Sequence, residues 1–476
     1  MTRRTEKSVA VTDLPEDRLA TMDESGRRLY LHPADASGRF RRWRTLVYSV
    51  LLVIFLVLPW IKIGGYQAIL LDLPQRKFAI FGLTFWAHDA PMLLFVLGTF
   101  VLGLLLVTAI WGRVWCGWAC PQTVFIDMVY RRIETWFEGN FIQRRKLMEA
   151  PWTFEKVARK GLKWLFFVGV SLVIAHSFLA YFVGVEELAR MVRSSPVENP
   201  GAFGVMAFVA GLILFDFGWF REQFCIVACP YGRLQSVLMD DRSLTVAYDE
   251  QRGEPRKQRG LPADQTGDCV SCFKCVQVCP TGIDIRRGLQ MECIGCTACI
   301  DACDEVMDKV DKPRGLIRYA SMEEIQTGKK SRGSLRSLAY LALLLAVVSG
   351  LVVTISQREP LNVSVIRPPD APYRVLDTGE IVNRFRLHVA NTGFEDMLVD
   401  FRIEPGDLDY PIATARRPVP VAGGESESID IFVRFPRNAL ENGKKSVHLA
   451  VVTVESDQGT EGLHKSQQVE LLGPVR

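Results

Sequence analysis

Residues 269–303 read CVSCFKCVQVCPTGIDIRRGLQMECIGCTACIDAC, and the two cysteine runs in this stretch decide the fold of the region around it. The first run has the spacing CxxCxxCxxxC and is followed by Pro280. The second run has the same spacing but is followed by Asp304. In runs of this kind three thiolates hold one cubane iron–sulfur cluster, while the fourth cysteine reaches across to another cluster. The stretch therefore predicts a ferredoxin-like fold built around two [4Fe–4S] clusters.

The crossed arrangement predicts the ligands of each cluster. For cluster 1 they are Cys269, Cys272, Cys275 and Cys303. For cluster 2 they are Cys293, Cys296, Cys299 and Cys279. Zinc is the alternative, since CxxC spacing also suits a tetrahedral ion, but two complete runs with Pro280 and Gly282 behind one of them favour iron and sulfur. Residues 240–335 leave little room for an apolar core, so we expect an α+β domain that the clusters nucleate.

The other four of the twelve cysteines form a repeated CxxxCP motif, CGWACP at residues 116–121 and CIVACP at residues 225–230, with the copies 109 residues apart. Positions i and i+4 of a helix share one face, so each copy can present two thiolates to one ion. Soft thiolates suit Cu(I), zinc or an iron–sulfur cluster. Packing of free cysteine is the alternative, which the duplication disfavours. The predicted metal site comprises Cys116, Cys120, Cys225 and Cys229.

Apolar runs divide the chain into membrane and water-facing parts, although 23% of its residues are charged. Five runs are long enough to cross a hydrocarbon layer of roughly 30 Å at about 1.5 Å per residue. They are Leu46–Ile61, Ala90–Trp111, Trp164–Gly184, Pro200–Phe220 and Ser337–Gln357. We therefore expect a multidomain membrane protein with an α-helical transmembrane bundle, four of its spans within residues 39–239 and the fifth within residues 336–358.

Basic residues predict the orientation of these spans. Arg39, Arg41, Arg42 and Arg44 precede the first run, and the loop between the second and third runs is rich in Lys and Arg. By the positive-inside tendency the N-terminus lies in the cytoplasm and the C-terminus on the outer side of the membrane, with all cysteines on the cytoplasmic side. A cleaved signal peptide is the alternative for the first run, but no small-residue cleavage site follows it and about forty polar residues precede it.

The two ends of the chain differ in pattern. Residues 1–38 are polar without an apolar period and predict a flexible cytoplasmic arm. Residues 359–476 contain period-two runs such as 384–390 and 429–435, separated by turn sequences. This pattern predicts an all-β sandwich of immunoglobulin-like type on the outer side of the membrane, serving as a structural or docking module.

Two ionisable residues lie within the apolar runs. Asp216 stands nine residues before Cys225 and is a candidate member of the same site, with pairing to Arg221 as the alternative. His176 cannot ligate a haem from both sides alone, and a packing or hydrogen-bonding role is favoured. No glycine-rich dinucleotide fingerprint follows a predicted strand, so the electron donor is not identified.

With these motifs assembled, the chain resembles the FixG/RdxA/CcoG family, accessory proteins for assembly of cbb3-type cytochrome c oxidase. The resemblance covers nearly the whole chain after the arm. Its motifs are SGRFR at 37–41, WCGWACPQ at 115–122, CIVACPYGR at 225–233, CIGCTACIDAC at 293–303 and PRGLIRY at 313–319. The CxxxCP motif alone is shared with membrane ferredoxins of denitrification.

The resemblance implies cupric reductase activity, in which electrons pass through the clusters and reduce Cu(II) to Cu(I). It makes Cys116, Cys120, Cys225 and Cys229 the copper-site candidates. The implied partners are the lipid bilayer, copper chaperones, the cbb3-type oxidase assembly machinery and an unidentified electron donor. We expect no nucleic-acid partner, and a homodimer is left open. The alternative functions are a quinol-linked membrane electron conduit and a non-catalytic assembly scaffold with redox-sensing clusters.

Overall fold

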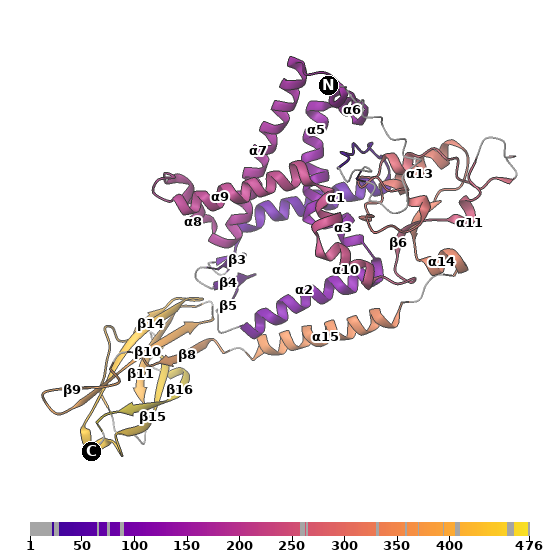
Figure 1. The fold of residues 1–476 in the computed structure, drawn as a ribbon. Helices are drawn as coiled ribbons and strands as arrows, with labels where there is room; N and C mark the ends of the chain where they lie inside the picture. The colour runs from indigo at the N-terminus through magenta and orange to yellow at the C-terminus, as the bar shows by residue number, and fades with distance from the viewer. Residues whose placement is uncertain are drawn as a thin grey trace. The chain divides into compact units, whose positions relative to one another are not determined.

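The computed structural model describes residues 21–22, 28–63, 66–73, 77–85, 90–257, 262, 265–329, 333–357, 359–369, 371–393, 395–404, 410–454 and 461–474. The chain divides into two compact units, whose elements are drawn in Figure 1. The first unit comprises Met1–Ile61, Ile69–Leu73 and Leu93–Leu351, and the second comprises Lys62–Ala68, Pro74–Met92 and Val352–Arg476. All twelve cysteines belong to the first unit.

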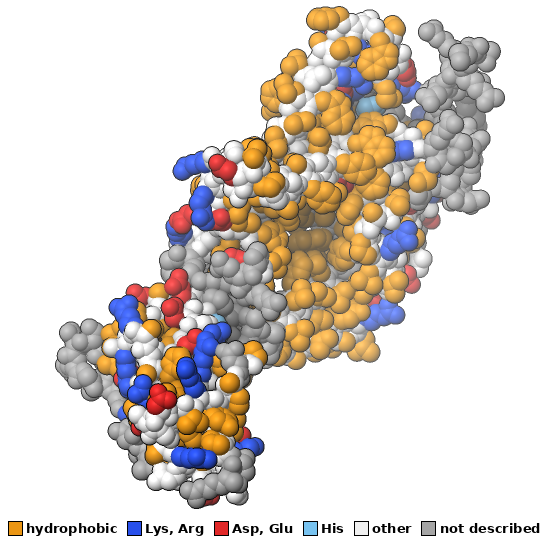
Figure 2. Space-filling model, turned by 60° about the vertical axis from the view of Figure 1, so that its left-hand side comes forward, with side chains coloured by type: hydrophobic (Ala, Val, Ile, Leu, Met, Phe, Trp, Pro, Cys, Tyr) orange, Lys and Arg blue, Asp and Glu red, His pale blue; other side chains and the backbone are white. Residues whose placement is uncertain are grey.

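The five predicted spans are confirmed as helices long and apolar enough to cross a membrane, within the described residues. They are α1 (Arg39–Val57) with η2 (Leu58–Trp60), α2 (Ala90–Trp111), α7 (Phe154–Val183), α9 (Pro200–Ile213) with η5 (Leu214–Phe220), and α15 (Leu335–Ser356). Their apolar side chains are largely exposed in the isolated chain, and Figure 2 shows hydrophobic side chains gathered over much of the surface in view. Such surfaces need a lipid environment.

Helix α7 begins at Phe154, ten residues before the apolar run does. The hydroxyl of Thr153 caps it by accepting a hydrogen bond from the Lys156 backbone N–H at 3.3 Å. Its first turns carry Lys and Arg, and only the later turns are apolar. The helix therefore extends beyond the predicted span because capping and water-facing charge stabilise its first part.

Aromatic packing joins the helices of the first unit. Tyr130, Phe167 and Phe217 form a buried cluster, with the Tyr130 and Phe167 ring centroids 4.9 Å apart. Helices α2 and α15 run side by side, and a Cβ added at Gly350 of α15 would lie 3.0 Å from the Phe95 ring of α2. The spans are thus held by close ring and backbone contacts.

Short helices connect the spans. Between α2 and α7 lie α3 (Val114–Trp118), α4 (Pro121–Phe125), the π-helix η4 (Ile126–Tyr130), α5 (Arg131–Glu138) and α6 (Phe141–Glu149). Helix α8 (Val185–Arg193) connects α7 to α9. The π-helix η6 (Phe224–Ala228) and helix α10 (Pro230–Leu238) follow η5.

The cysteine-rich domain is a small α+β fold. Strands β6 (Thr245–Tyr248) and β7 (Ile317–Ala320) pair antiparallel. The other elements are α11 (Glu250–Gly253), α12 (Lys274–Gln277), η8 (Ile285–Arg287), α13 (Ala298–Lys309) and α14 (Met322–Thr327). Cys269 and Cys275 are part of its apolar core, beside Val246 and Ile317. The core is therefore built around the cysteines, as expected for a domain with few apolar residues.

The second unit contains the predicted antiparallel β-sandwich. One sheet has the order β12-β14-β10-β8 with β9 on β10, and the other has the order β13-β11-β15-β16. The strands are β8 (Leu361–Ile366), β9 (Arg374–Val375), β10 (Ile381–Asn391), β11 (Met397–Ile403), β12 (Ile412–Ala413), β13 (Val419–Val421), β14 (Ser426–Phe435), β15 (Lys444–Val454) and β16 (Glu461–Leu472). Alternate residues such as Phe385, Leu387 and Ile431 fill its core, as the period-two pattern predicts.

Short strands lie between α1 and α2. In the second unit β1 (Lys62–Ile63) pairs with β2 (Tyr66–Gln67), and β4 (Lys77–Ile80) pairs with β5 (Leu83–Phe85). In the first unit β3 (Ile69–Asp72) lies against α7. The sequence analysis predicted none of these strands, because each is too short to show a period of two.

Candidate functional site

The eight cysteines of residues 269–303 line two cavities in the first unit. One cavity is lined by Cys269, Cys272, Cys275 and Cys303. The other is lined by Cys279, Cys293, Cys296 and Cys299, and Cys275 lines both cavities. The structure therefore brings together the same two crossed sets that the spacing predicts, and their binding of clusters remains a prediction.

Both sets fit a cubane better than a single ion. Among the described residues no three Cys, His, Asp or Glu side chains gather closely enough to hold one metal ion. Zinc–sulfur bonds of about 2.3 Å would draw four thiolates close around a point, whereas a cubane occupies the space between more widely separated sulfurs. Each cavity is a small space of this kind, surrounded by thiols and apolar side chains.

The loops around both sets repeat one backbone conformation. Phe273 and Thr297 each follow the second cysteine of their run, and each has a left-handed backbone with φ of 57° and 61°. Each residue also precedes a helix, α12 or α13. Left-handed residues turn successive backbone N–H groups towards one side and form anion-binding nests, which suit a negatively charged cluster.

Burial raises the pKa of the thiols in both sets. Desolvation is the main cause for Cys275, Cys279 and Cys303, whose pKa rises to about 12, and for Cys293, whose pKa rises to about 11. Buried thiols with these pKa values become thiolates only when a metal's positive charge replaces the proton. The sets are therefore suited to hold iron rather than to act as free reactive thiolates.

Both CxxxCP motifs adopt the same backbone fold. In the first motif (Cys116–Pro121) the Cys120 N–H donates to the Trp115 carbonyl at 2.9 Å, and in the second (Cys225–Pro230) the Cys229 N–H donates to the Phe224 carbonyl at 2.8 Å. Both bonds span five residues, a wide turn of the π type that is frequent at functional sites. The two cysteines of a motif therefore do not share one regular α-helix, and a new helix begins at the proline, which forces the residue before it into an extended conformation.

The two halves of each motif therefore differ in conformation. Cys116 lies on α3 and Cys225 on η6, whereas Cys120 and Cys229 are extended residues that precede α4 and α10. Burial raises the pKa of Cys116 to about 12 and also raises the pKa of Cys120 and Cys225. Charge on Cys120, Cys116 and Cys229 further raises the pKa of Cys225. The four thiols thus share one region of the first unit, but among the described residues no three of them lie close enough to hold one metal ion.

Polar side chains surround these thiols. The Gln235 amide, which is fully buried, donates to the Cys116 sulfur at 3.2 Å. The Gln122 amide donates to the Asp216 carboxylate at 2.9 Å, and the charge of Asp216 raises the pKa of Cys120. Asp216 therefore lies beside the first motif, although the sequence placed it near the second.

The alternative pairing of Asp216 with Arg221 is not observed. Arg221 instead donates two hydrogen bonds to Glu134, at 2.7 and 3.0 Å. Glu134 is 1% exposed and also pairs with Arg144 at 3.4 Å. The Nδ1 of His176 lies 2.8 Å from the Leu172 carbonyl of its own helix, which agrees with a hydrogen-bonding role.

Direct contact joins the first motif to the loop of the second cysteine set. A Cβ added at Gly117 would lie 2.2 Å from the Gly295 carbonyl oxygen and 3.0 Å from the Cys296 nitrogen. Gly295 has φ of +66° and itself has no room for a side chain, because Arg113 backbone atoms lie against it. The Arg113 guanidinium donates to the Cys293 carbonyl at 2.7 Å. The two backbones therefore meet without intervening side chains.

A carboxylate on α13 fixes the ferredoxin-like domain to the first span. Asp301 accepts hydrogen bonds from the Phe40 and Arg41 backbone N–H groups at 3.0 and 2.6 Å and so caps α1. The Phe40 ring packs edge-on against Trp118 and Tyr319, and the Trp118 indole donates to the Tyr319 hydroxyl at 3.0 Å. Sequence reasoning missed this joint, although all five of its residues lie in the quoted motifs.

Described residues of the predicted flexible arm also contact the domain. The Ala34 N–H donates to the Gln277 carbonyl at 2.8 Å, and the Arg28 guanidinium donates to the Trp219 carbonyl at 2.5 Å. A Cβ at Gly282 would lie 2.7 Å from the Leu31 side chain. The end of the arm thus contacts both the cysteine-rich domain and the end of the fourth span.

Comparison with known proteins places these features in a family. A 4Fe-4S dicluster domain matches residues 220–322, a 4Fe-4S binding domain matches residues 93–145, and the immunoglobulin-like fold at the C-terminus of FixG matches residues 351–474. Protein RdxB of Cereibacter sphaeroides is 38% identical over 380 residues, which cover 75% of this chain and 78% of the relative. The chain belongs to the FixG/RdxA family.

Two further relatives match across most of the chain. RdxA of Cereibacter sphaeroides is 33% identical over 431 residues, covering 87% of this chain and 90% of the relative. The nitrogen fixation protein FixG of Rhizobium meliloti is 32% identical over 434 residues, covering 82% and 81%. As a FixG/RdxA-type protein, the chain is an iron–sulfur electron-transfer protein with apolar helices and a C-terminal immunoglobulin-like domain.

The matched regions include the CxxxCP motifs. Residues 93–145 contain the first motif, and residues 220–322 contain the second motif together with both cysteine sets. Iron–sulfur binding was one of the chemistries that soft thiolates allow at these motifs. The family comparison therefore keeps that alternative open beside copper.

Proposed function

We propose that the chain transfers electrons from its ferredoxin-like domain to the CxxxCP thiols and there reduces Cu(II) to Cu(I), in support of cbb3-type oxidase assembly. The single observation that carries this proposal is the contact of Gly117 with Gly295 and Cys296. It joins a predicted cluster ligand to a CxxxCP motif through backbone alone. Electrons therefore have a short route between the two thiol sets.

The two cavities support a proposal for the ligands of this route. We propose Cys269, Cys272, Cys275 and Cys303 as ligands of cluster 1, and Cys279, Cys293, Cys296 and Cys299 as ligands of cluster 2. When bound, the clusters supply one-electron transfer. Cys272 is exposed, whereas no member of the second set is, so electrons from a donor protein enter at the first set and leave at the second.

Thiolates at the CxxxCP motifs favour the reduced product. Soft sulfur ligands bind Cu(I) better than Cu(II), so they raise the reduction potential of bound copper. The substrate Cu(II) gains one electron and becomes Cu(I), and no proton transfer is required. Gln235 orients Cys116 for this step, and Asp216 lies close to Cys120.

The proposed orientation is N-terminus inside and C-terminus outside. The basic segments from Arg113 to Lys163 and before α15 support a cytoplasmic position for both CxxxCP motifs and both cysteine sets. The β-sandwich would then lie in the periplasm of a bacterial inner membrane. Copper chaperones and the oxidase assembly machinery are the proposed partners, with the sandwich as a docking module.

Anaerobic protein tests the proposal directly. After dithionite reduction and removal of excess reductant, Cu(II) should restore the visible absorbance of the oxidised clusters and yield one Cu(I) per electron, captured by a Cu(I)-specific chelator. Replacing Cys116, Cys120, Cys225 and Cys229 by serine should slow this reaction while preserving the cluster absorbance. If the four-serine variant reoxidised at the same rate as the unsubstituted protein, the four cysteines would not be the site of copper reduction.

The 4Fe-4S match over residues 93–145 favours a second candidate function. In that case the CxxxCP thiols hold a further iron–sulfur cluster and pass electrons onward, as in a quinol-linked conduit. Two clusters require about eight iron atoms per chain, and a third raises this to about twelve. Iron and sulfide analysis of anaerobically purified protein, with its quinol oxidation measured without copper, separates the two candidates.

A further inference from the structure

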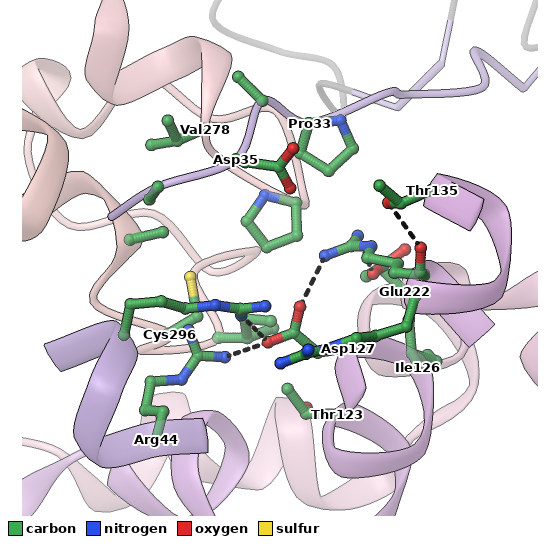
Figure 3. A pocket seen from close by; sticks show the side chains of 18 of the residues that line it. Pro33, Asp35, Arg44, Thr123, Ile126, Asp127, Thr135, Glu222, Val278 and Cys296 are labelled. Carbon is green, nitrogen blue, oxygen red and sulfur yellow. Dashed lines mark hydrogen bonds and ion pairs between the residues drawn. The ribbon is translucent and has the colours of Figure 1, made fainter. Parts of the chain in front are cut away.

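A cavity of about 280 Å³ lies in the first unit beside both redox thiol sets (Figure 3). Its walls come from the end of the N-terminal arm at Pro33–Ala36, from α1 and the helices that follow the first motif, and from the loops of the ferredoxin-like domain. Cys225 of the second motif and Cys296 of the second cysteine set both line it. A molecule in this cavity would therefore contact a predicted cluster ligand and a CxxxCP thiol at once.

The size of the cavity suits a small molecule rather than a bare ion. At about 30 Å³ for each water, 280 Å³ corresponds to roughly nine water molecules. Ligand pockets begin near 300 Å³, whereas a single metal ion needs only a closed set of ligand atoms. The cavity can thus hold a metal ion together with the ligands that accompany it.

Arginines dominate the chemistry of the walls. Five of them line the cavity: Arg41, Arg44, Arg131, Arg132 and Arg144. The carboxylates that line it are Asp35, Asp127, Glu222 and Asp301. Figure 3 shows Asp127 surrounded by guanidinium groups, and it pairs with Arg41, Arg44 and Arg131.

Several cationic groups retain donors for a ligand. The Asp301 carboxylate is occupied by the backbone N–H groups that it caps, and Asp35 is exposed. Arg131 and Arg144 are paired with carboxylates, but Arg132 is exposed and the side chain of Arg41 is 30% exposed. N–H groups of Arg41 and Arg132 therefore remain accessible to a bound anion. Five arginines against four carboxylates give the lining a net charge of +1, which favours an anion over hydrated Cu²⁺.

We propose that this cavity binds the copper substrate as an anionic Cu(II) complex, whose carboxylate or thiolate groups contact the arginines while the metal lies near Cys225. This inference rests on the proposed cupric reduction and names the substrate class. The guanidinium groups hold the anionic ligands, and the complex gains one electron without a change of its ligands. Arg132 sits at the exposed side of the cavity and guides the complex inwards.

Binding is tested without turnover, on full-length protein in neutral detergent with oxidised clusters. The probes are Cu(II)–citrate, which is anionic, and Cu(II)–ethylenediamine, which is cationic, and the EPR signal of Cu(II) reports the bound fraction. The citrate complex should bind at least tenfold more tightly, and added salt should weaken it. Arg132→Glu should weaken citrate-complex binding about tenfold, since a charge reversal beside the ligand costs more than 1 kcal/mol. Arg145→Gln is the matched control, because Arg145 is exposed on α6 and pairs with Glu149.

The outcomes separate this inference from the proposed function. Equal binding of the two complexes, an unchanged affinity in Arg132→Glu, or equally tight binding of copper-free citrate would overturn the inference. Displacement of the complex by phosphatidylglycerol vesicles would assign the cavity to a lipid headgroup and would also overturn it. If both complexes are reduced at equal rates, this result would support cupric reduction and would contradict a site that selects anionic complexes. Tight binding of the citrate complex without any reduction would support the site and remove the proposed function.

Discussion

The two CxxxCP motifs share one backbone fold but differ in what surrounds them. The first places Gly117 against the loop of the second cysteine set, and the equivalent position in the second motif is the half-buried Ile226. Arg113, ahead of the first motif, bonds to the Cys293 carbonyl, whereas Arg221, ahead of the second, bonds to Glu134. The two copies of the motif therefore differ in their surroundings, since the first contacts the loop of the second cysteine set and Cys225 of the second lines the arginine-lined cavity.

The largest expected effect comes from removing the anchor of the second motif. Glu134→Gln leaves Arg221, Arg144 and Lys163 without their shared carboxylate, and breaking a buried ion pair costs about 3–5 kcal/mol. We expect a lower free energy of unfolding and faster proteolysis around α5, measured beside Glu149→Gln. The Glu149 side chain is 64% exposed, so losing its ion pair with Arg145 should change the free energy of unfolding by less than about 1 kcal/mol.

The same carboxylate predicts a pH dependence. Burial alone would raise the pKa of Glu134, but Arg221 and the neighbouring cations lower it to about 2. A lowered pKa means that the stabilisation is complete above the ordinary glutamate pKa near 4.5 and is lost as the pH falls towards 2. Thermal unfolding measured across this window should show a smaller slope in Glu134→Gln than in the unsubstituted protein. Equal slopes would exclude Glu134 as the titrating group.

Exchanging the central residues tests the difference between the motifs directly. Gly117→Ile copies the second motif into the first and must push the Gly295 loop away, and a displacement of about 1 Å can slow a reaction about 100-fold. The measurement is stopped-flow reoxidation of the reduced clusters by Cu(II), with iron content checked for both proteins. Ile226→Gly is the reciprocal control and should retain most of the rate. Equal slowing in both variants would mean that the motifs do not differ in role.

The smallest expected effect concerns one hydrogen bond. Burial raises the pKa of Cys116 to about 12. The hydrogen bond that the Gln235 side-chain amide donates to the Cys116 sulfur has a smaller, opposite effect on this pKa. Gln235→Leu should raise this pKa further and slow alkylation of Cys116 about fivefold, the equivalent of roughly 1 kcal/mol. Cys229, labelled in the same sample and identified by mass spectrometry, serves as the internal reference. Alkylation of Cys116 at an unchanged rate would show that the bond is absent in solution.

The sequence predicted what depends on local pattern. Hydropathy located the five helices, period-two alternation located the sandwich, and cysteine spacing predicted the grouping that the two cavities show. It did not predict contacts between distant segments. Gly117 lies inside the first motif, but nothing in the sequence indicated a contact there. Asp301 is one of several acidic residues of α13, and the sequence does not distinguish it from the others. Such contacts depend on which surfaces of the folded chain pack together, and the pattern of a single sequence does not predict that packing.

The ionic network was missed for a related reason. Arg144 and Lys163 were considered only as basic residues that orient the spans, Arg221 was considered as a partner for Asp216, and Glu134 was overlooked. Charge statistics describe segments, whereas burial of one carboxylate among three cations depends on the packing of α5 against α7. The alternative pairing of Asp216 with Arg221 failed because Glu134 reaches Arg221 from another helix.

The cap on α1 has a consequence for biogenesis. Synthesis produces the first span early, but the carboxylate that completes its N-terminus belongs to residue 301. The helix can therefore insert when it leaves the ribosome, yet it reaches its final position only after four spans and the cysteine-rich domain have been translated. Folding of that domain would then act as a checkpoint for the first span, because an early part of the chain is secured only after a much later one has formed.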